Sequence, residues 1–233
     1  GGMINFSEFC FDGIFSSELV QDRLQPLTKH LDFVRVACHH NELIFASQIL
    51  ELSRLLGIKV FLNIMQCAQF DVKSYEALTS ALVENPGCIE AVYFADSTGS
   101  MTPTDFTRLF CQFSKAVPAQ PLGIHAHNNL QLALANSLAA IDCGHVEWVD
   151  STILGMGRGA GNVWTEHLTC MFCEDSNSLF MMAESLSRLH RDHFTEIAER
   201  YQWGTSIGNI IGAITRIHPT YIQKAEEVLD ANE

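Results

Sequence analysis

Short apolar runs rich in β-branched residues alternate with longer amphipathic stretches over the first three quarters of the chain. Apolar runs of this kind are typical of buried strands in a parallel sheet, and the stretches between them are typical of crossover helices. The pattern predicts strands at residues 3–5, 33–37, 59–65, 90–95, 122–127 and 146–152. It predicts helices at residues 18–31, 42–56, 72–84, 104–117, 130–143 and 163–173.

Turn residues support several of these boundaries. Gly57 and Gly144 each follow a helical pattern, at the position where a left-handed residue commonly ends a helix. Thr102 and Pro103 open a predicted helix as a capping residue followed by a proline at the first helical position. After Cys173 the rhythm changes, and helical patterns without a strand occupy residues 179–201, 207–217 and 219–229.

Six βα units in succession predict an α/β fold with a parallel sheet. Such sheets carry their chemistry at the carboxyl ends of the strands, whether the sheet is open or closed into a barrel. A standard barrel needs about eight units, and segment 3–5 begins in mid-pattern with no helix before it, so we place the shortfall at the N-terminus. We expect a (β/α) domain at residues 1–175 and a helical extension of the same domain at residues 176–233.

Composition narrows the class of protein. The 233 residues fit one domain, and the 27 acidic and 14 basic residues give a formal charge of −13. This balance argues against binding to nucleic acid or to anionic membranes, because both need clustered lysine and arginine. The sequence has no apolar run long enough for a membrane span and no signal-peptide layout at its start, so we expect a cytoplasmic protein.

Eight cysteines are scattered through apolar segments, which favours reduced core thiols over a disulfide framework. Cys170 and Cys173 have CxxC spacing, but they lie on a predicted helix without a redox or zinc context. We interpret this pair as packing residues.

The strongest chemical signal is His125-Ala126-His127, in the apolar run 121–128. Residues two apart on a strand share a face, so the two imidazoles can converge on one ion. The alternative is a strand end with two half-buried histidines bonded to the backbone, and for an isolated His-x-His pair we would favour it. The downstream sequence changes that balance.

A glycine-rich segment, Gly155-Met-Gly-Arg-Gly-Ala-Gly-Asn162, follows the next predicted strand. Its glycines permit positive φ angles and close approach to a ligand, and we predict substrate binding by Gly157, Gly159, Gly161 and Asn162. The alternative is a tight turn, which would need one or two glycines rather than four. Arg158 can pair with a substrate carboxylate or with an acidic neighbour.

Other polar residues also follow predicted strands. His39 and His40 are candidates for proton transfer, with one of them facing the cleft. Asp96 either supports the metal histidines or caps the turn that follows it, and the turn sequence favours capping. Asp150 is expected to position a histidine or the glycine-rich loop, because metal-bound imidazoles usually donate their other N–H to an acceptor.

Taken together, these motifs resemble one family. The chain is similar to the HMG-CoA-lyase-like, or DRE-TIM metallolyase, superfamily of TIM barrels, and within it to the 4-hydroxy-2-oxovalerate aldolases. The residues that carry this resemblance are Gly123-Ile-His-Ala-His-Asn-Asn-Leu130, Ala135-Asn-Ser137, Val149-Asp-Ser-Thr152, the segment 155–162 with Glu166, Val34-Arg-Val-Ala37 with His39, Ala95–Met101, Tyr201-Gln-Trp-Gly204 and Ile217–Tyr221.

The resemblance implies a TIM-type (β/α) barrel that lacks its first two βα units, with a C-terminal helical extension. It also implies a divalent metal, Mn²⁺ first and Mg²⁺ or Co²⁺ as alternatives, with His125, His127 and Asn162 as metal residues. His39, Arg158 and Asp96 are the catalytic candidates. The Arg-Asp segment that supplies a further ligand and an arginine in this family has no counterpart here. Gly1-Gly2 is either a purification scar or the visible part of a longer polypeptide.

The resemblance further implies a lyase that cleaves or forms the C–C bond of a 4-hydroxy-2-oxo acid, with a small 2-oxo acid as substrate. One rival is a synthase that condenses an acyl-CoA with a 2-oxo acid. Another is a non-catalytic or fragment relative that serves as a binding or assembly partner. Because missing units would leave sheet edges open, we expect a homo-oligomer or a partner that covers the edge.

Overall fold

The computed structural model describes residues 1–11 and 14–230. Six strands form one sheet in the order β1-β4-β5-β6-β7-β8, and the pairs at β1–β4, β4–β5 and β5–β6 are parallel. The strands are β1 (Gly2–Asn5), β4 (Phe33–His39), β5 (Lys59–Met65), β6 (Ala91–Asp96), β7 (Leu122–Ala126) and β8 (Val146–Val149). The predicted α/β class and all six strands are confirmed.

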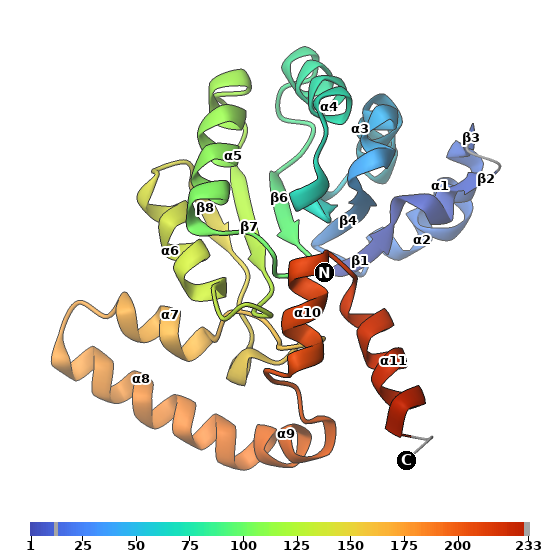
Figure 1. The fold of residues 1–233 in the computed structure, drawn as a ribbon. Coiled ribbons are helices and arrows are strands. Elements are labelled where there is room, and N and C mark those ends of the chain that lie inside the picture. Colours follow the sequence, from blue (N-terminus) through green and yellow to red (C-terminus); the bar gives the residue numbers. More distant parts are fainter. Residues whose placement is uncertain (12–13, 231–233) are drawn as a thin grey trace. The chain divides into compact units, whose positions relative to one another are not determined.

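Helices follow the strands in the predicted alternation (Figure 1). They are α3 (Ala46–Leu56), α4 (Val72–Glu84), α5 (Pro103–Ala116), α6 (Ala133–Asp142) and α7 (Thr165–Met171), and the tail forms α8 (Ser176–Leu189), α9 (Thr195–Tyr201), α10 (Ile207–Thr215) and α11 (Pro219–Asp230). Gly57 and Gly144 have φ angles of 64° and 75°, as their positions after helices predict.

The single helix predicted at 18–31 is wrong. The structure has two short helices there, α1 (Ser17–Arg23) and α2 (Gln25–Thr28). Pro26 lacks a backbone N–H and cannot bond to the carbonyl four residues earlier, so the helix cannot continue through it. A two-stranded antiparallel sheet of β2 (Cys10–Phe11) and β3 (Ile14–Phe15) lies outside the predicted pattern, because two residues carry no readable period.

The chain separates into two compact units. Unit 1 comprises Gly1–Ala95, Thr107–Ile124 and Cys143–Trp148, and unit 2 comprises Asp96–Phe106, His125–Asp142 and the chain from Val149 onward. Unit 1 therefore holds most of the strands, and unit 2 holds the segments that follow β6, β7 and β8 together with the tail. The expected boundary between residues 175 and 176 stays a prediction, and residues 231–233 of the expected extension lie outside the described residues.

Each unit has its own packing. In unit 1 the ring of Phe94 on β6 packs edge-on against Phe110 and Phe113 of α5, at centroid distances of 5.5 and 5.1 Å. In unit 2 the side chains of Asn129 and Asn136 are buried and bonded to backbone carbonyls.

None of the eight cysteines is in a disulfide; Cys38 and Cys67 are buried and the other six are half-buried. In the described part of the chain, no helix is long and apolar enough to span a membrane.

Candidate functional site

The two histidines of the His-x-His motif lie beside each other in unit 2. His125 is the second-to-last residue of β7, and His127 is the first residue after the strand. Their ring centroids are 5.1 Å apart and the ring planes are inclined by 69°. The strand geometry therefore does bring the two imidazoles together, as their spacing predicts.

Asp150, one residue after β8, fixes the orientation of His125. Its Oδ2 lies 2.9 Å from His125 Nδ1, and both side chains are about three quarters buried. With Nδ1 engaged by the carboxylate, the Nε2 lone pair of His125 is the one that remains for a ligand. This is the positioning role that the sequence predicts for Asp150.

His127 carries a buried polar atom without a partner. Its Nδ1 makes no hydrogen bond within the described residues. The pKa of His127 is lowered to about 3, first by burial and then by the positive charges of His125, Arg158 and His218. The ring is therefore neutral at physiological pH, which is the form that binds a metal ion.

Asn162, at the end of the glycine-rich segment, meets His127 across an antiparallel bridge. Its Nδ2 donates to the Met156 carbonyl at 3.0 Å, while its Oδ1 is buried without a partner in the described chain. Two buried unpaired acceptors thus lie on bridged neighbours. Leaving such an atom unpaired costs about 1–3 kcal/mol, so this arrangement calls for a ligand or another compensating role.

The glycines of segment 155–162 are required by the fold of the loop itself. Gly155, Gly159 and Gly161 have φ angles of 64°, 63° and 86°. A Cβ on Gly157 would lie 2.5 Å from Asn162 Nδ2, so a larger residue would displace the amide. Asn162 N–H donates inside the loop to the Gly155 carbonyl, which removes it as a donor to a substrate carboxylate. Substrate binding by the loop stays a prediction.

Asp96 is fully buried at the end of β6 and is bonded to the turn that follows it. Its carboxylate accepts from Ser100 N at 3.1 Å, from Met101 N at 2.8 Å and from Thr98 Oγ1 at 3.3 Å. Burial raises the pKa of Asp96, and these hydrogen bonds oppose the shift. The bonds match the capping interpretation; a catalytic role for Asp96 stays a prediction.

Asn129 joins two loops of the site, a role that the sequence analysis did not predict. Its Nδ2 donates to the Thr98 carbonyl at 3.0 Å, and its Oδ1 accepts from Ala160 N at 2.9 Å. The turn after β6 and the glycine-rich loop are therefore held to the residue that comes two positions after His127. The pair Asn128-Asn129 directly after the histidines is the one local feature of the sequence that could have drawn attention to this contact.

A second missed group is the pair Glu166–His190. The Nε2 of His190 is hydrogen-bonded to Glu166 Oε1, which also accepts from Leu154 N at 2.8 Å. Glu166 therefore connects the glycine-rich loop to the π-helical turn His190–Phe194 of the tail. The two residues are 24 positions apart, and no local pattern predicts their contact.

The remaining predicted residues are divided between the units. Arg158 is in unit 2, where its charge and its backbone both act on the His127 ring. His39 is in unit 1, at the end of β4, with an exposed side chain and a backbone N–H that donates to Glu42 Oε2 at 2.6 Å. Its role in proton transfer stays a prediction.

The donor set around the histidines fits a divalent cation. Within residues 1–11 and 14–230 the structure contains no group of three or more histidine, cysteine, aspartate or glutamate side chains arranged for a metal ion. Two imidazoles and one amide oxygen, from His125, His127 and Asn162, stay the predicted ligand set. Two of these residues carry the unpaired buried atoms described above, and nitrogen and oxygen donors suit borderline and hard divalent ions.

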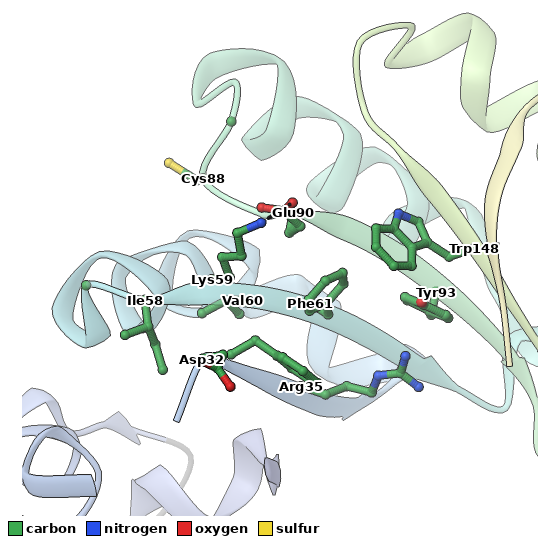
Figure 2. A pocket seen from close by; sticks show the side chains of 13 residues that line it. Asp32, Arg35, Ile58, Lys59, Val60, Phe61, Cys88, Glu90, Tyr93 and Trp148 are labelled. Atoms are coloured by element: carbon green, nitrogen blue, oxygen red, sulfur yellow. Dashed lines mark hydrogen bonds and ion pairs between the residues drawn. The ribbon is translucent and has the colours of Figure 1, made fainter. Parts of the chain in front are cut away.

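Unit 1 contains a hollow of about 900 Å³ at the amino ends of its strands (Figure 2). Residues at the starts of β4, β5 and β6 line it, and Figure 2 shows Phe61 with Tyr93 and Trp148 gathered over the strands. The guanidinium of Arg35 lies 4.0 Å from the Tyr93 ring centroid. Parallel sheets carry their chemistry at the carboxyl ends, so this hollow at the amino ends is a poor candidate for the reaction site.

Comparison with known proteins gives a consistent result. The sequence profile of the HMGL-like family matches residues 30–191. The chain is 38% identical over 146 residues to a 4-hydroxy-2-oxovalerate aldolase of Carboxydothermus hydrogenoformans, a match that covers 60% of the chain and 41% of that protein. It is 32% identical over 141 residues to the enzyme of the same name from Thermus thermophilus, covering 60% and 40%.

Solved structures agree in fold. The N-terminal domain of a candidate aldolase from Bacteroides vulgatus superimposes with a TM-score of 0.73 at 26% identity, covering 95% of the chain and 70% of that structure. An HMG-CoA lyase of Bacillus subtilis gives a TM-score of 0.59 at 16% identity, covering 84% and 71%, which is a likeness of fold alone.

The match spans about two fifths of the length of the curated relatives. The family profile, by contrast, covers more than half of the chain, and it includes β4 to β8 and both histidines. The chain therefore belongs to the HMGL-like family.

Proposed function

We propose that this chain carries the metal-binding centre of a carbon–carbon lyase that cleaves a 4-hydroxy-2-oxo acid into pyruvate and an aldehyde. One observation carries the proposal: His125 and His127 lie side by side, with unpaired buried atoms on His127 and on its bridged neighbour Asn162. The names of the relatives, 4-hydroxy-2-oxovalerate aldolase, point to the same chemistry.

The metal that we propose is Mn²⁺, with Mg²⁺ or Co²⁺ as alternatives. His125, His127 and Asn162 would hold it, and Asp150 would keep the His125 ring in place through Nδ1. Such an ion acts as a Lewis acid that stabilises negative charge developing on a bound 2-oxo acid. The neutral His127 ring needs no deprotonation before it can serve as a ligand.

The reaction breaks the bond between C3 and C4 of the substrate. The proton of the 4-hydroxyl passes to a base, and C4 becomes the carbonyl carbon of the aldehyde. The electron pair of the broken bond moves onto C3 and gives the enolate of pyruvate, which then takes a proton at C3. No oxidant or reductant is needed. We assign Arg158 to the substrate carboxylate, because its backbone is hydrogen-bonded to the His127 ring and a guanidinium can bind a carboxylate with two hydrogen bonds.

We further propose a cytoplasmic location, because eight cysteines scattered through apolar segments favour reduced core thiols. We also propose that the protein works as an oligomer or with a partner. β1 and β8 are the end strands of the sheet in the described chain, and a sheet edge left open there would need a cover.

The experiment is a coupled assay for pyruvate release from 4-hydroxy-2-oxovalerate. We expect release with Mn²⁺ and none in the presence of EDTA, and the activity should return on adding Mn²⁺ back. Release of free CoA from an acyl-CoA and a 2-oxo acid, without pyruvate release, would instead favour the synthase. Absence of both activities, from a sample that binds Mn²⁺, would favour a non-catalytic relative.

A further inference from the structure

Unit 2 contains a second hollow, of about 810 Å³, which we call the tail pocket. One wall is the glycine-rich loop at Gly157–Gly159. The other walls come from the tail helices α9, α10 and α11 and the segment between α9 and α10. The side chains that matter for its chemistry are those of Arg158, Tyr201, Trp203, Asn209, Gln223 and Glu226.

Specific contacts hold the tail against the loop. Trp203 Nε1 donates to the Leu154 carbonyl at 2.9 Å, and Gly204 N donates to the Gly159 carbonyl at 3.3 Å. A Cβ on Gly159 would lie 3.2 Å from Pro219 Cβ, so the start of α11 packs directly on the loop. The tail pocket is therefore a built feature of unit 2.

The polar side chains of the tail pocket offer hydrogen-bond acceptors. Asn209 uses its Nδ2 on the Gly204 carbonyl at 3.0 Å, which leaves the amide oxygen to accept. Gln223 uses its Nε2 on Glu227 at 3.3 Å, with the same consequence. Glu226 receives Ser206 Oγ on Oε1 at 3.3 Å and has a second carboxylate oxygen. Acceptors of this kind bind hydroxyl groups, which are donors. The charged side chains in the lining are Arg158 and Glu226, so once Arg158 pairs with the substrate carboxylate the remaining charge repels phosphate.

Tyr201 and Trp203 complete the wall with aromatic surface. Pockets for small molecules combine apolar and aromatic surface with a few polar groups that fix orientation. The flat rings of Tyr201 and Trp203 can pack against the C–H groups of a ligand, and the acceptors can bind its hydroxyls. This combination suits a chain of hydroxylated carbons better than either a plain alkyl chain or an anion.

Arg158 connects the tail pocket to the histidines. The residue lines the pocket, and its backbone is hydrogen-bonded to the His127 ring. The tail pocket and the His127 ring therefore share Arg158 as a neighbour. With the 2-oxo acid end at the imidazoles, as the proposed function has it, this pocket is the one we take for the aldehyde half.

We propose that the tail pocket binds a neutral, polyhydroxylated aldehyde half, so that the substrate is a sugar-like 4-hydroxy-2-oxo acid with hydroxyls beyond C4. This inference rests on the proposed function. It assigns Asn209, Gln223 and Glu226 as the residues that determine specificity, a role that needs no contact with the reacting carbons.

The first test compares two substrates in the pyruvate assay: the aldol adduct of pyruvate with erythrose, and 4-hydroxy-2-oxovalerate, whose tail is a methyl group. We expect kcat/KM to be higher for the hydroxylated substrate by about tenfold or more, because unpaired pocket acceptors penalise a tail that lacks hydroxyls. Pyruvate release with a ratio near one would overturn this inference alone. No pyruvate from either substrate would overturn the proposed function itself.

The second test uses Gln223→Leu, with Lys224→Gln as the matched control on the next residue of α11, which does not line the tail pocket. Gln223→Leu should reduce the kcat/KM ratio of the two substrates about fivefold or more, since a donor loses its acceptor. Lys224→Gln should leave the ratio unchanged. Equal ratios in the wild type and Gln223→Leu would contradict the assignment.

Binding gives a readout that does not depend on turnover. In EDTA, the indole N–H resonance of Trp203, assigned by its loss in Trp203→Phe, should shift on adding the erythrose adduct. Adding the phosphorylated adduct, made from erythrose 4-phosphate, should shift it much less because of Glu226. An unmoved resonance with the erythrose adduct, or an equal shift with both, would overturn the proposal.

Discussion

The hollow of unit 1 and the histidine site of unit 2 are built in different ways. In the hollow of unit 1 the groups satisfy one another: Phe61 packs edge-on against Tyr93 and Trp148, and Lys59 pairs with Glu90 at 3.1 Å. Beside the histidines of unit 2, His127 Nδ1 and Asn162 Oδ1 are buried without partners in the described chain. Single buried atoms without a hydrogen bond also occur in the described part of unit 1, on His40 and Asn63. The candidate site is therefore marked by two such atoms on bridged neighbours rather than by volume or by an isolated atom.

The largest expected effect is on catalysis. His127→Ala should lower kcat/KM for pyruvate release by about 10³-fold or more, because loss of a metal ligand removes several kcal/mol of transition-state stabilisation. Arg35→Met, in the hollow of unit 1, should change kcat/KM by less than about threefold, since we assign that hollow no part in the chemistry. The pyruvate assay measures both, and a similar loss in both variants would erase the distinction between the histidine site and the hollow of unit 1.

The next effect concerns the glycine-rich loop and is one of stability. Gly159 and Gly57 have nearly the same φ, 63° and 64°, but a Cβ on Gly159 would lie 2.7 Å from Asn129 Oδ1, while one on Gly57 meets nothing within 4 Å. Both alanine variants have the left-handed backbone cost of about 1–2 kcal/mol. Gly159→Ala should lose about 1–3 kcal/mol more, from the displaced Asn129.

Urea unfolding of the two glycine variants provides the measurement. Equal losses in Gly57→Ala and Gly159→Ala would show that the loop tolerates a side chain at residue 159. The loop would then not be as tightly fixed on Asn129 as we describe.

The pH dependence of stability tests the burial of His127. The folded-state pKa of about 3 lies below the usual value of 6.5, so below pH 6.5 the unfolded chain binds a proton that the folded chain does not. Stability is therefore complete above pH 6.5 and falls as the pH decreases towards 3, by about 2 kcal/mol between pH 6.5 and 4.5.

The matched variant is His127→Gln, which removes the titrating group while keeping a polar side chain. Urea unfolding in EDTA at several pH values should give a shallower slope for this variant than for the wild type. Parallel slopes would mean that His127 titrates normally in the folded protein.

The smallest effect belongs to the hollow of unit 1. Arg35→Met removes a guanidinium that lies 4.0 Å from the Tyr93 ring centroid. A partly exposed cation–π contact contributes about 0.5–1 kcal/mol, so urea unfolding should detect a loss of that order. A loss of several kcal/mol would indicate that Arg35 is central to the core of unit 1.

The fold was predictable where periodicity is long and regular. The strand at Lys59–Met65 and the helix at Val72–Glu84 have the bounds that the sequence predicts. The helix predicted from residue 130 begins at Ala133, because Gln131 adopts a φ of 58° that no local pattern reveals. The π-helical turn His190–Phe194 within the tail also leaves no mark on the hydrophobic pattern.

The site was predictable where chemistry depends on close sequence spacing. The pairing of His125 with His127 follows from their two-residue separation on a strand, and a carboxylate beside His125 follows from metal-ligand chemistry. The contact of Asn129 with Ala160 depends on how distant loops fold back on one another. Side-chain amides and tail residues carry no spacing rule, so only the structure reveals such contacts.

The most direct measurement is Mn²⁺ binding by isothermal titration calorimetry to the wild-type chain and to the double variant His125→Ala/His127→Ala. Arg35→Met serves as the control, and circular dichroism verifies that all three proteins are folded. We expect one ion per chain in the wild type and in Arg35→Met, and none at the same concentrations in the double variant. One tightly bound ion in the folded double variant would contradict the site described here.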